Sequence, residues 1–98
     1  MISIAIQGNS KFANETRKVV KAVSGEAVKG NHFCINGDFD SVCVALQTFF
    51  MQAVLSGAVS KYAVVDGDQQ TDSWGSSSGE CVEVLDLDTG VEKIYFIQ

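Results

Sequence analysis

Hydrophobic and polar residues alternate at the start of the chain and then change to helical spacing. Residues 2–6 alternate isoleucine with a small residue, and this period of two predicts a strand that ends at Gly8. Ser10 is a suitable N-cap for a helix that Gly25 can end. The stripe expected to be buried on this helix consists of Phe12, Thr16, Val19, Val20 and Val23.

The most hydrophobic segment follows a second short strand. That strand is predicted at residues 31–36 after a loop rich in Gly and Lys, and Asp40 or Ser41 then caps a helix that reaches Leu55. One side of this helix carries Val42, Leu46, Phe49, Phe50, Ala53 and Val54, and the other side carries Val44, Met51 and Leu55. A helix that is apolar nearly all round needs cover on more than one face, so it is either the central helix of the domain or one half of a dimer contact.

The character of the chain changes after a third predicted strand, residues 62–65, which follows the helix-ending Gly57. From Asp66 to Glu80 the chain contains four acidic residues, three glycines, four serines and one large apolar side chain. Such a composition cannot bury enough surface to form a packed element. We therefore expect a long mobile loop over residues 66–80.

The last segment, residues 81–97, is predicted to form a hairpin around Asp88-Thr89-Gly90, with Gly90 in the positive-φ position of a three-residue turn. This turn would pair Leu87 with Val91. The core face of the hairpin would then carry Val82, Val84, Ile94 and Phe96, and the other face Glu83, Leu85, Lys93 and Tyr95.

The order of elements predicts an α+β fold: strand, helix, strand, helix, strand, long loop, strand, strand. Both helices are expected on one face of a mainly antiparallel sheet, and a small α/β sandwich with a partly parallel sheet is the alternative. The chain has 98 residues, of which 46% are hydrophobic and 19% charged, which suits one domain over residues 1–98. These values exclude a two-domain enzyme and a disordered tail.

Cysteine content and the lack of a leader sequence predict a cytoplasmic protein. Residues 1–6 are too short for the apolar region of an export signal, and the odd number of cysteines favours free thiols. Residues 41–60 contain no charged residue and have the length of a membrane span, but they include Gln47 and Gln52. A buried helix is therefore the preferred interpretation.

Charge is distributed unevenly along the chain, whose net charge is −5. Residues 1–30 contain five basic and two acidic residues, a net charge of +3, whereas residues 31–98 contain two basic and ten acidic residues, a net charge of −8. Such a field can steer a charged partner into place. A solvated acidic surface that keeps the protein soluble is the alternative.

Metal sites are not expected. Asp66, Asp68, Gln70 and Asp72 alternate like the start of a calcium loop, but the glycine and the final glutamate of such a loop are missing. His32 and Cys34 share one face of a predicted strand, yet the chain has a single histidine and no paired cysteine spacing of a zinc site.

Catalysis and nucleic-acid binding lack a complete motif, and no cofactor is expected. Cys43 lies in the first turn of the predicted long helix, where a thiol can be activated, but the nearby carboxylates of Asp38 and Asp40 oppose this and a packing role is favoured. Gly8-Asn9-Ser10 lacks the further residues of a phosphate-binding loop. The basic residues of the first helix, without exposed aromatic residues between them, favour a solvated face over a nucleic-acid contact: Lys11, Arg17, Lys18 and Lys21.

Trp74 is the single tryptophan and lies among acidic, glycine and serine residues. It is either a protein-binding hot spot with an acidic rim or a lid over the core. The residues predicted to contact a partner are Asp66, Asp68, Asp72, Trp74 and Glu80.

The sequence favours binding over catalysis. The first hypothesis is a small acidic module that inhibits or occupies the basic, nucleic-acid-binding surface of a larger protein partner, in the manner of a phage anti-defence or immunity-type protein. The second is a small-ligand or metal-binding protein that uses the acidic loop and the surface near His32 and Cys34. The third is a homo-oligomeric structural protein, a dimer through the helix at residues 42–55.

Overall fold

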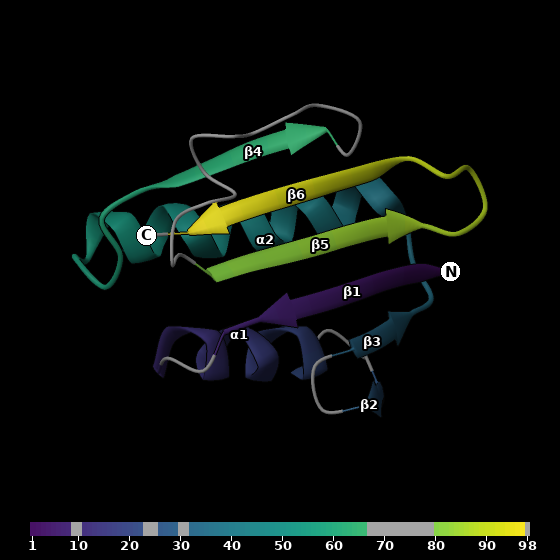
Figure 1. Cartoon of the computed structure of the whole chain (residues 1–98), viewed down its shortest axis with the longest axis horizontal. Helices are drawn as coiled ribbons and strands as arrows, with labels where there is room; N and C mark the ends of the chain where they lie inside the picture. The colour runs from purple at the N-terminus through teal and green to yellow at the C-terminus, as the bar shows by residue number, and fades with distance from the viewer. Residues whose placement is uncertain (9–10, 23–25, 30–31, 67–79, 98) are drawn as a thin grey trace.

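The computed structural model describes residues 1–8, 11–22, 26–29, 32–66 and 80–97, and in these residues one six-stranded sheet carries two helices (Figure 1). This confirms the predicted α+β fold. The elements are β1 (Ile2–Gln7), α1 (Lys11–Ala22), β2 (Glu26–Lys29), β3 (His32–Ile35), α2 (Phe39–Leu55), β4 (Tyr62–Asp66), β5 (Glu80–Asp86) and β6 (Glu92–Ile97).

The sheet has the order β2-β3-β1-β5-β6-β4, and each neighbouring pair is antiparallel. A helical crossover returns the chain over the sheet face, so it joins strands that run in the same direction. In this sheet such strands are not neighbours: α1 joins β1 to β2 with β3 between them, and α2 joins β3 to β4 with three strands between them. Inserted strands therefore make the whole sheet antiparallel although both connections are helical.

Both helices lie on the same face of the sheet, as predicted, and the core is between them and the strands (Figure 1). Phe50 of α2 is fully buried at its centre, with ring centroids 5.3 Å from Tyr95 and 6.1 Å from Phe12. The Phe12 ring stacks on Phe49 at 5.3 Å and so joins the two helices directly. No described element covers the other face of the sheet, which we call the open face.

The predicted stripe of α1 is confirmed over the described residues. Phe12, Thr16 and Val20 are buried, and Val19 is half-buried. The Thr16 hydroxyl donates to the Phe12 carbonyl oxygen at 2.9 Å, so the one buried polar side chain of this stripe is satisfied within the helix. Val23 lies outside the described residues.

The cap of α2 is Asp38, not Asp40 or Ser41 as the sequence suggested. The Asp38 backbone is extended, and its carboxylate accepts hydrogen bonds from the backbone N–H and the hydroxyl of Ser41, both at 3.0 Å. The helix therefore begins at Phe39, whose ring packs against the core. Within the described part of the chain, no helix has the length and apolar character needed to cross a membrane.

The hairpin register differs from the prediction by one residue. Asp86 closes the turn opposite Val91, with its N–H 2.8 Å from the Val91 carbonyl oxygen, so the loop contains four residues instead of three. Val82 consequently pairs with Tyr95 and Val84 with Lys93. A shift of one residue moves each side chain to the opposite face. Tyr95 and Ile97 therefore belong to the core, and Ile94 and Phe96 lie on the open face.

The segment Glu26–Lys29, expected to be part of a loop, forms the edge strand β2. It pairs with β3, with an irregularity in register between Ala27 and Lys29. These four residues show no clear alternation of hydrophobic and polar side chains, so the sequence does not indicate a strand. Pairing with β3 stabilises the extended conformation instead.

Candidate functional site

The residues predicted to contact a partner do not form one described patch. Asp66 ends β4 opposite Lys93, whereas Glu80 begins β5 opposite Ile97, so the two residues lie at opposite ends of β6. Asp68, Asp72 and Trp74 lie outside the described residues, as does the predicted loop except for Asp66 and Glu80.

Glu80 has a packing contact in the described structure. It is half-buried beside Gly8, and a Cβ atom added to Gly8 would lie 2.5 Å from its Cγ atom. Gly8 adopts a φ of +124°, which brings the backbone close to the stem of Glu80. The Glu80 side chain therefore packs against the backbone of Gly8, where β1 ends and β5 begins.

At the other end of the sheet β3 and β5 end and β1 and β6 begin (Figure 1), and the segments that meet there carry a different group of acidic residues. Ile2 pairs with both Ile35 and Asp86, and Leu85 pairs with Glu92, so these strand ends are adjacent. We call this surface the acidic end. Its residues are Asp38, Asp40, Asp86, Asp88 and Glu92.

The turn holds part of the acidic end in place. The Met1 amino group lies 3.0 Å from an Asp88 carboxylate oxygen, and the Asp88 N–H donates to the Asp86 carboxylate at 3.0 Å. This N–H is the main cause of the lowered pKa of Asp86; desolvation opposes it, and hydrogen bonds from Thr89 and the charged amino terminus lower the pKa further. Asp86 and Asp88 are thus fixed in position, and Asp38 is fixed as the cap of α2.

The lowered pKa of Asp86 makes stability depend on pH. A group whose pKa is lower in the folded than in the unfolded state stabilises the fold above its unfolded pKa, and the contribution is lost as pH falls through the folded pKa. We expect Asp86→Ala to be less stable than the native protein at pH 7. The difference should shrink as the pH falls below the ordinary aspartate value of 3.8.

Urea unfolding at pH 7 and at successively lower pH values tests this expectation. Asp86→Asn is the matched control, since it removes the charge and retains an acceptor for the Asp88 N–H, and it should lie between the other two proteins at pH 7. A difference between native protein and Asp86→Ala that does not change with pH would contradict the assignment.

α1 begins at the end of β1 that is opposite the acidic end, and it then runs back along the sheet, so that Val19 and Val20 lie near Ile35 and Val42. Arg17 is committed to the fold: its guanidinium donates to Asn14 Oδ1 at 2.7 Å and also to the Gly8 carbonyl oxygen. Lys11, Lys18 and Lys21 are exposed. Asn9 and Ser10, part of the turn considered for anion binding, lie outside the described residues.

His32 and Cys34 lie on the open face, as their spacing predicted. The His32 Nε2 atom is hydrogen-bonded to the hydroxyl of Ser3 on the neighbouring strand. Among the described residues no group of three or more His, Cys, Asp or Glu side chains could hold a metal ion. His32 and Ser3 therefore form a hydrogen-bonded contact between adjacent strands on this face of the sheet.

Cys43 lies in a buried polar cluster beneath α2. Burial raises the pKa of its thiol, and a hydrogen bond with Tyr95 opposes this only partly. Burial also raises the pKa of Tyr95, whose hydroxyl donates to Gln47 Oε1 at 2.9 Å. A protonated, buried thiol is a packing group and not an activated nucleophile. The pKa of Cys81 is raised by burial as well.

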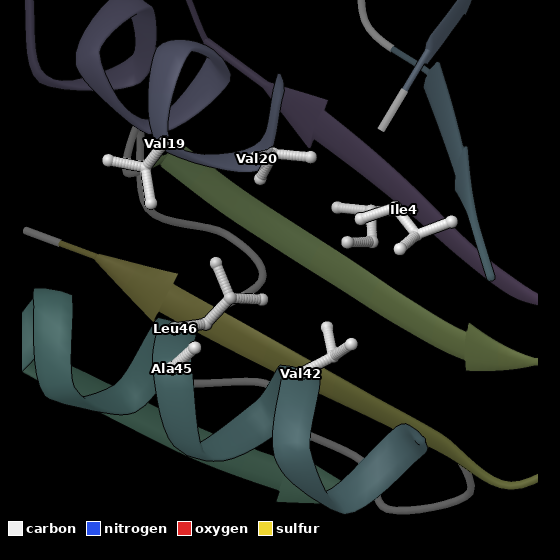
Figure 2. A pocket seen from close by; sticks show the side chains of 7 residues that line it. Ile4, Val19, Val20, Val42, Ala45 and Leu46 are labelled. Carbon is white, nitrogen blue, oxygen red and sulfur yellow. The ribbon is translucent and has the colours of Figure 1, made fainter. Parts of the chain in front are cut away.

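A small hollow lies between the helices and the sheet (Figure 2). It has room for about one water-sized sphere, ≈ 10 Å³, and its walls are entirely apolar. An organic ligand needs hundreds of cubic ångströms and a few polar groups to orient it. The hollow is therefore a gap in packing. Its lining residues are Ile4, Val19, Val20, Ile35, Val42, Ala45 and Leu46.

The outward side of α2 is apolar and exposed. Val44 is 62% exposed, Met51 50% and Leu55 80%. The sequence placed these residues opposite the buried stripe and predicted that the domain or a second copy covers them. No described element covers them, so the interpretation of α2 as a central helix covered on all sides is wrong for the described part of the chain.

The acidic end could not be found by scanning the sequence for a local acidic run, because its five residues come from two separate segments, residues 38–40 and 86–92. The register of β1 with β3 and β5 brings them together. Comparison of the chain with protein-family models, with curated proteins and with solved structures finds no match in any of the three.

Proposed function

We propose that this protein is a small binding module whose acidic end docks on a basic surface of a larger protein partner. The observation that carries the proposal is the gathering of five of the twelve acidic residues at one end of the sheet, on a chain with a net charge of −5. A surface of this kind suits a basic groove that otherwise receives nucleic acid, so the module would act as an inhibitor or decoy of the anti-defence or immunity type.

The arrangement of the acidic end supports binding by preorganisation. Asp38, Asp86 and Asp88 are held by a helix cap, a turn and the amino terminus, so a partner would not have to order them. The side chains of Asp40 and Glu92 make no hydrogen bond or ion pair with the described residues. They contribute charge without supporting the fold.

The predicted loop supplies further acidic residues and Trp74 to this proposal. Asp66, the first residue of the loop, lies at the same end of the sheet as the Asp86–Glu92 turn, since it pairs with Lys93. Action in the cytoplasm fits the three cysteines, each of which is a free thiol.

Affinity capture with the purified protein, followed by calorimetry with the captured partner, tests the proposal. The informative variant is Asp40→Asn/Glu92→Gln, which removes two negative charges without touching a described hydrogen bond. We expect it to weaken binding about three- to tenfold at low salt, and the difference to disappear in about 1 M salt, where exposed charges are screened.

Glu15→Gln is the matched control, because Glu15 is an exposed acidic residue on α1, away from the acidic end. It should bind like the native protein. A second variant that reverses Asp66, Asp68 and Asp72 separates the loop from the acidic end. A partner whose affinity ignores salt and all these substitutions would overturn the proposal.

A further inference from the structure

The exposed apolar residues of α2 form a seam with regular spacing. Val44, Thr48, Met51 and Leu55 follow one another at intervals of four, three and four residues. This is the spacing of the a and d positions of a coiled coil, which pack against a second helix. No described element of the chain occupies that position.

Thr48 is the one polar member of the seam, and its hydroxyl is already satisfied. It donates to the Val44 carbonyl oxygen of its own helix at 2.9 Å. Burial of Thr48 against another helix would therefore leave no unpaired hydroxyl, and its methyl group would face the contact.

The spacing reads the same in both directions, which makes the seam complementary to itself in antiparallel orientation. If two copies of α2 pack about a twofold axis, Val44 of one copy faces Leu55 of the other, and Thr48 faces Met51. These pairs are the layers of an antiparallel coiled coil.

The charges at the two ends of α2 select the same orientation. Asp38 and Asp40 stand at the beginning of the helix, Lys61 follows its end, and residues 41–60 contain no charge. A parallel pair would bring four carboxylates together, whereas an antiparallel pair places the acidic start of each helix near the basic residue of the other copy.

We infer that α2 is the contact of a symmetric homodimer, in which the seams of two copies pack antiparallel. This contact goes beyond the proposed function. It brings Asp38 and Asp40 of the acidic end toward Lys61 of the other copy, whereas Asp86, Asp88 and Glu92, at the turn between β5 and β6, are not part of the seam.

The dimer should be weak. Three apolar side chains and one threonine per copy cover less than the roughly 800 Å² per partner of a standard interface. We therefore expect a dissociation constant of roughly 10 µM to 1 mM.

Sedimentation equilibrium of the full chain, from about 10 µM to 1 mM, tests this inference. Thr48→Leu completes the apolar seam and should tighten the dimer about tenfold, because the added surface is buried in both copies. Met51→Lys should remain a monomer. Gln52→Lys is the matched control: it adds the same charge at the neighbouring exposed position, which flanks the seam and stays in solvent, and should weaken the dimer much less than Met51→Lys.

Cross-linking with a short thiol reagent reports the orientation in a background with Cys34→Ala and Cys81→Ala. A mixture of Val44→Cys and Leu55→Cys proteins should give mixed dimers, and neither protein alone should cross-link. Cross-linking of Val44→Cys with itself would overturn the antiparallel arrangement. A monomer at 1 mM for both the native protein and Thr48→Leu, or equal effects of Met51→Lys and Gln52→Lys, would overturn the dimer.

Discussion

Phe50→Ala should lower the free energy of unfolding by about 3–5 kcal/mol, the range for removal of a buried aromatic ring. Phe50 is fully buried, and its ring centroid lies 5.3 to 6.1 Å from those of four other rings. These rings come from both helices and from β4 and β6, so the cavity would open where all the layers meet. Because domains of this size are stable by only about 5–15 kcal/mol, the variant should be near the limit of folding.

Urea unfolding followed by circular dichroism measures this loss. Met51→Ala is the matched control, since Met51 is the next residue of the same helix and is half-exposed; it should cost less than about 1 kcal/mol. Protein at about 1 µM keeps the proposed dimer dissociated, so that the control reports the monomer. Equal losses in the two variants would contradict the central position of Phe50.

Gly8→Ala should cost about 2 kcal/mol, from two causes that can be separated. The φ of +124° is a conformation that residues with a side chain rarely adopt, and the new Cβ would lie 2.5 Å from the Glu80 Cγ atom. The backbone near Gly8 must therefore move, or the Glu80 side chain must move away from Gly8.

Two further variants divide the cost. Gly57→Ala meets no atom within 4 Å but has a φ of +82°, so it measures the backbone cost of a positive φ without a collision. Glu80→Ala combined with Gly8→Ala should recover the part due to the collision, and a double-mutant cycle gives its size. If Gly8→Ala cost no more than Gly57→Ala, the packing of Glu80 on Gly8 would be disproved.

Helical spacing and strand alternation were sufficient to predict the two helices, five of the strands and the side of the sheet that the helices cover. The reason is that each signal is local: the stripe of α1 and the apolar residues of α2 are read directly from positions three and four residues apart. The sequence also placed Val44, Met51 and Leu55 opposite the buried stripe of α2, but it left open whether the domain itself covers them.

Features that depend on how the strands pair could not be predicted from the sequence. The hairpin register depends on whether the turn holds three or four residues, and the backbone hydrogen bonds of Asp86 decide this. Because of this shift of one residue, Tyr95 lies in the core, where the sequence had predicted Phe96. The acidic end depends on the same pairing, together with the position of β1 between β3 and β5.

The central position of β1 has a consequence for folding kinetics. Its two neighbours are β3 and β5, and the second pairing joins residues as distant in sequence as Ile2 and Asp86. Because long-range pairings have to overcome the entropy of closing large loops, this topology should fold more slowly than a helical domain of similar length. Because β1 pairs with β5 on one side, the complete sheet can form only once residues 80–86 are available.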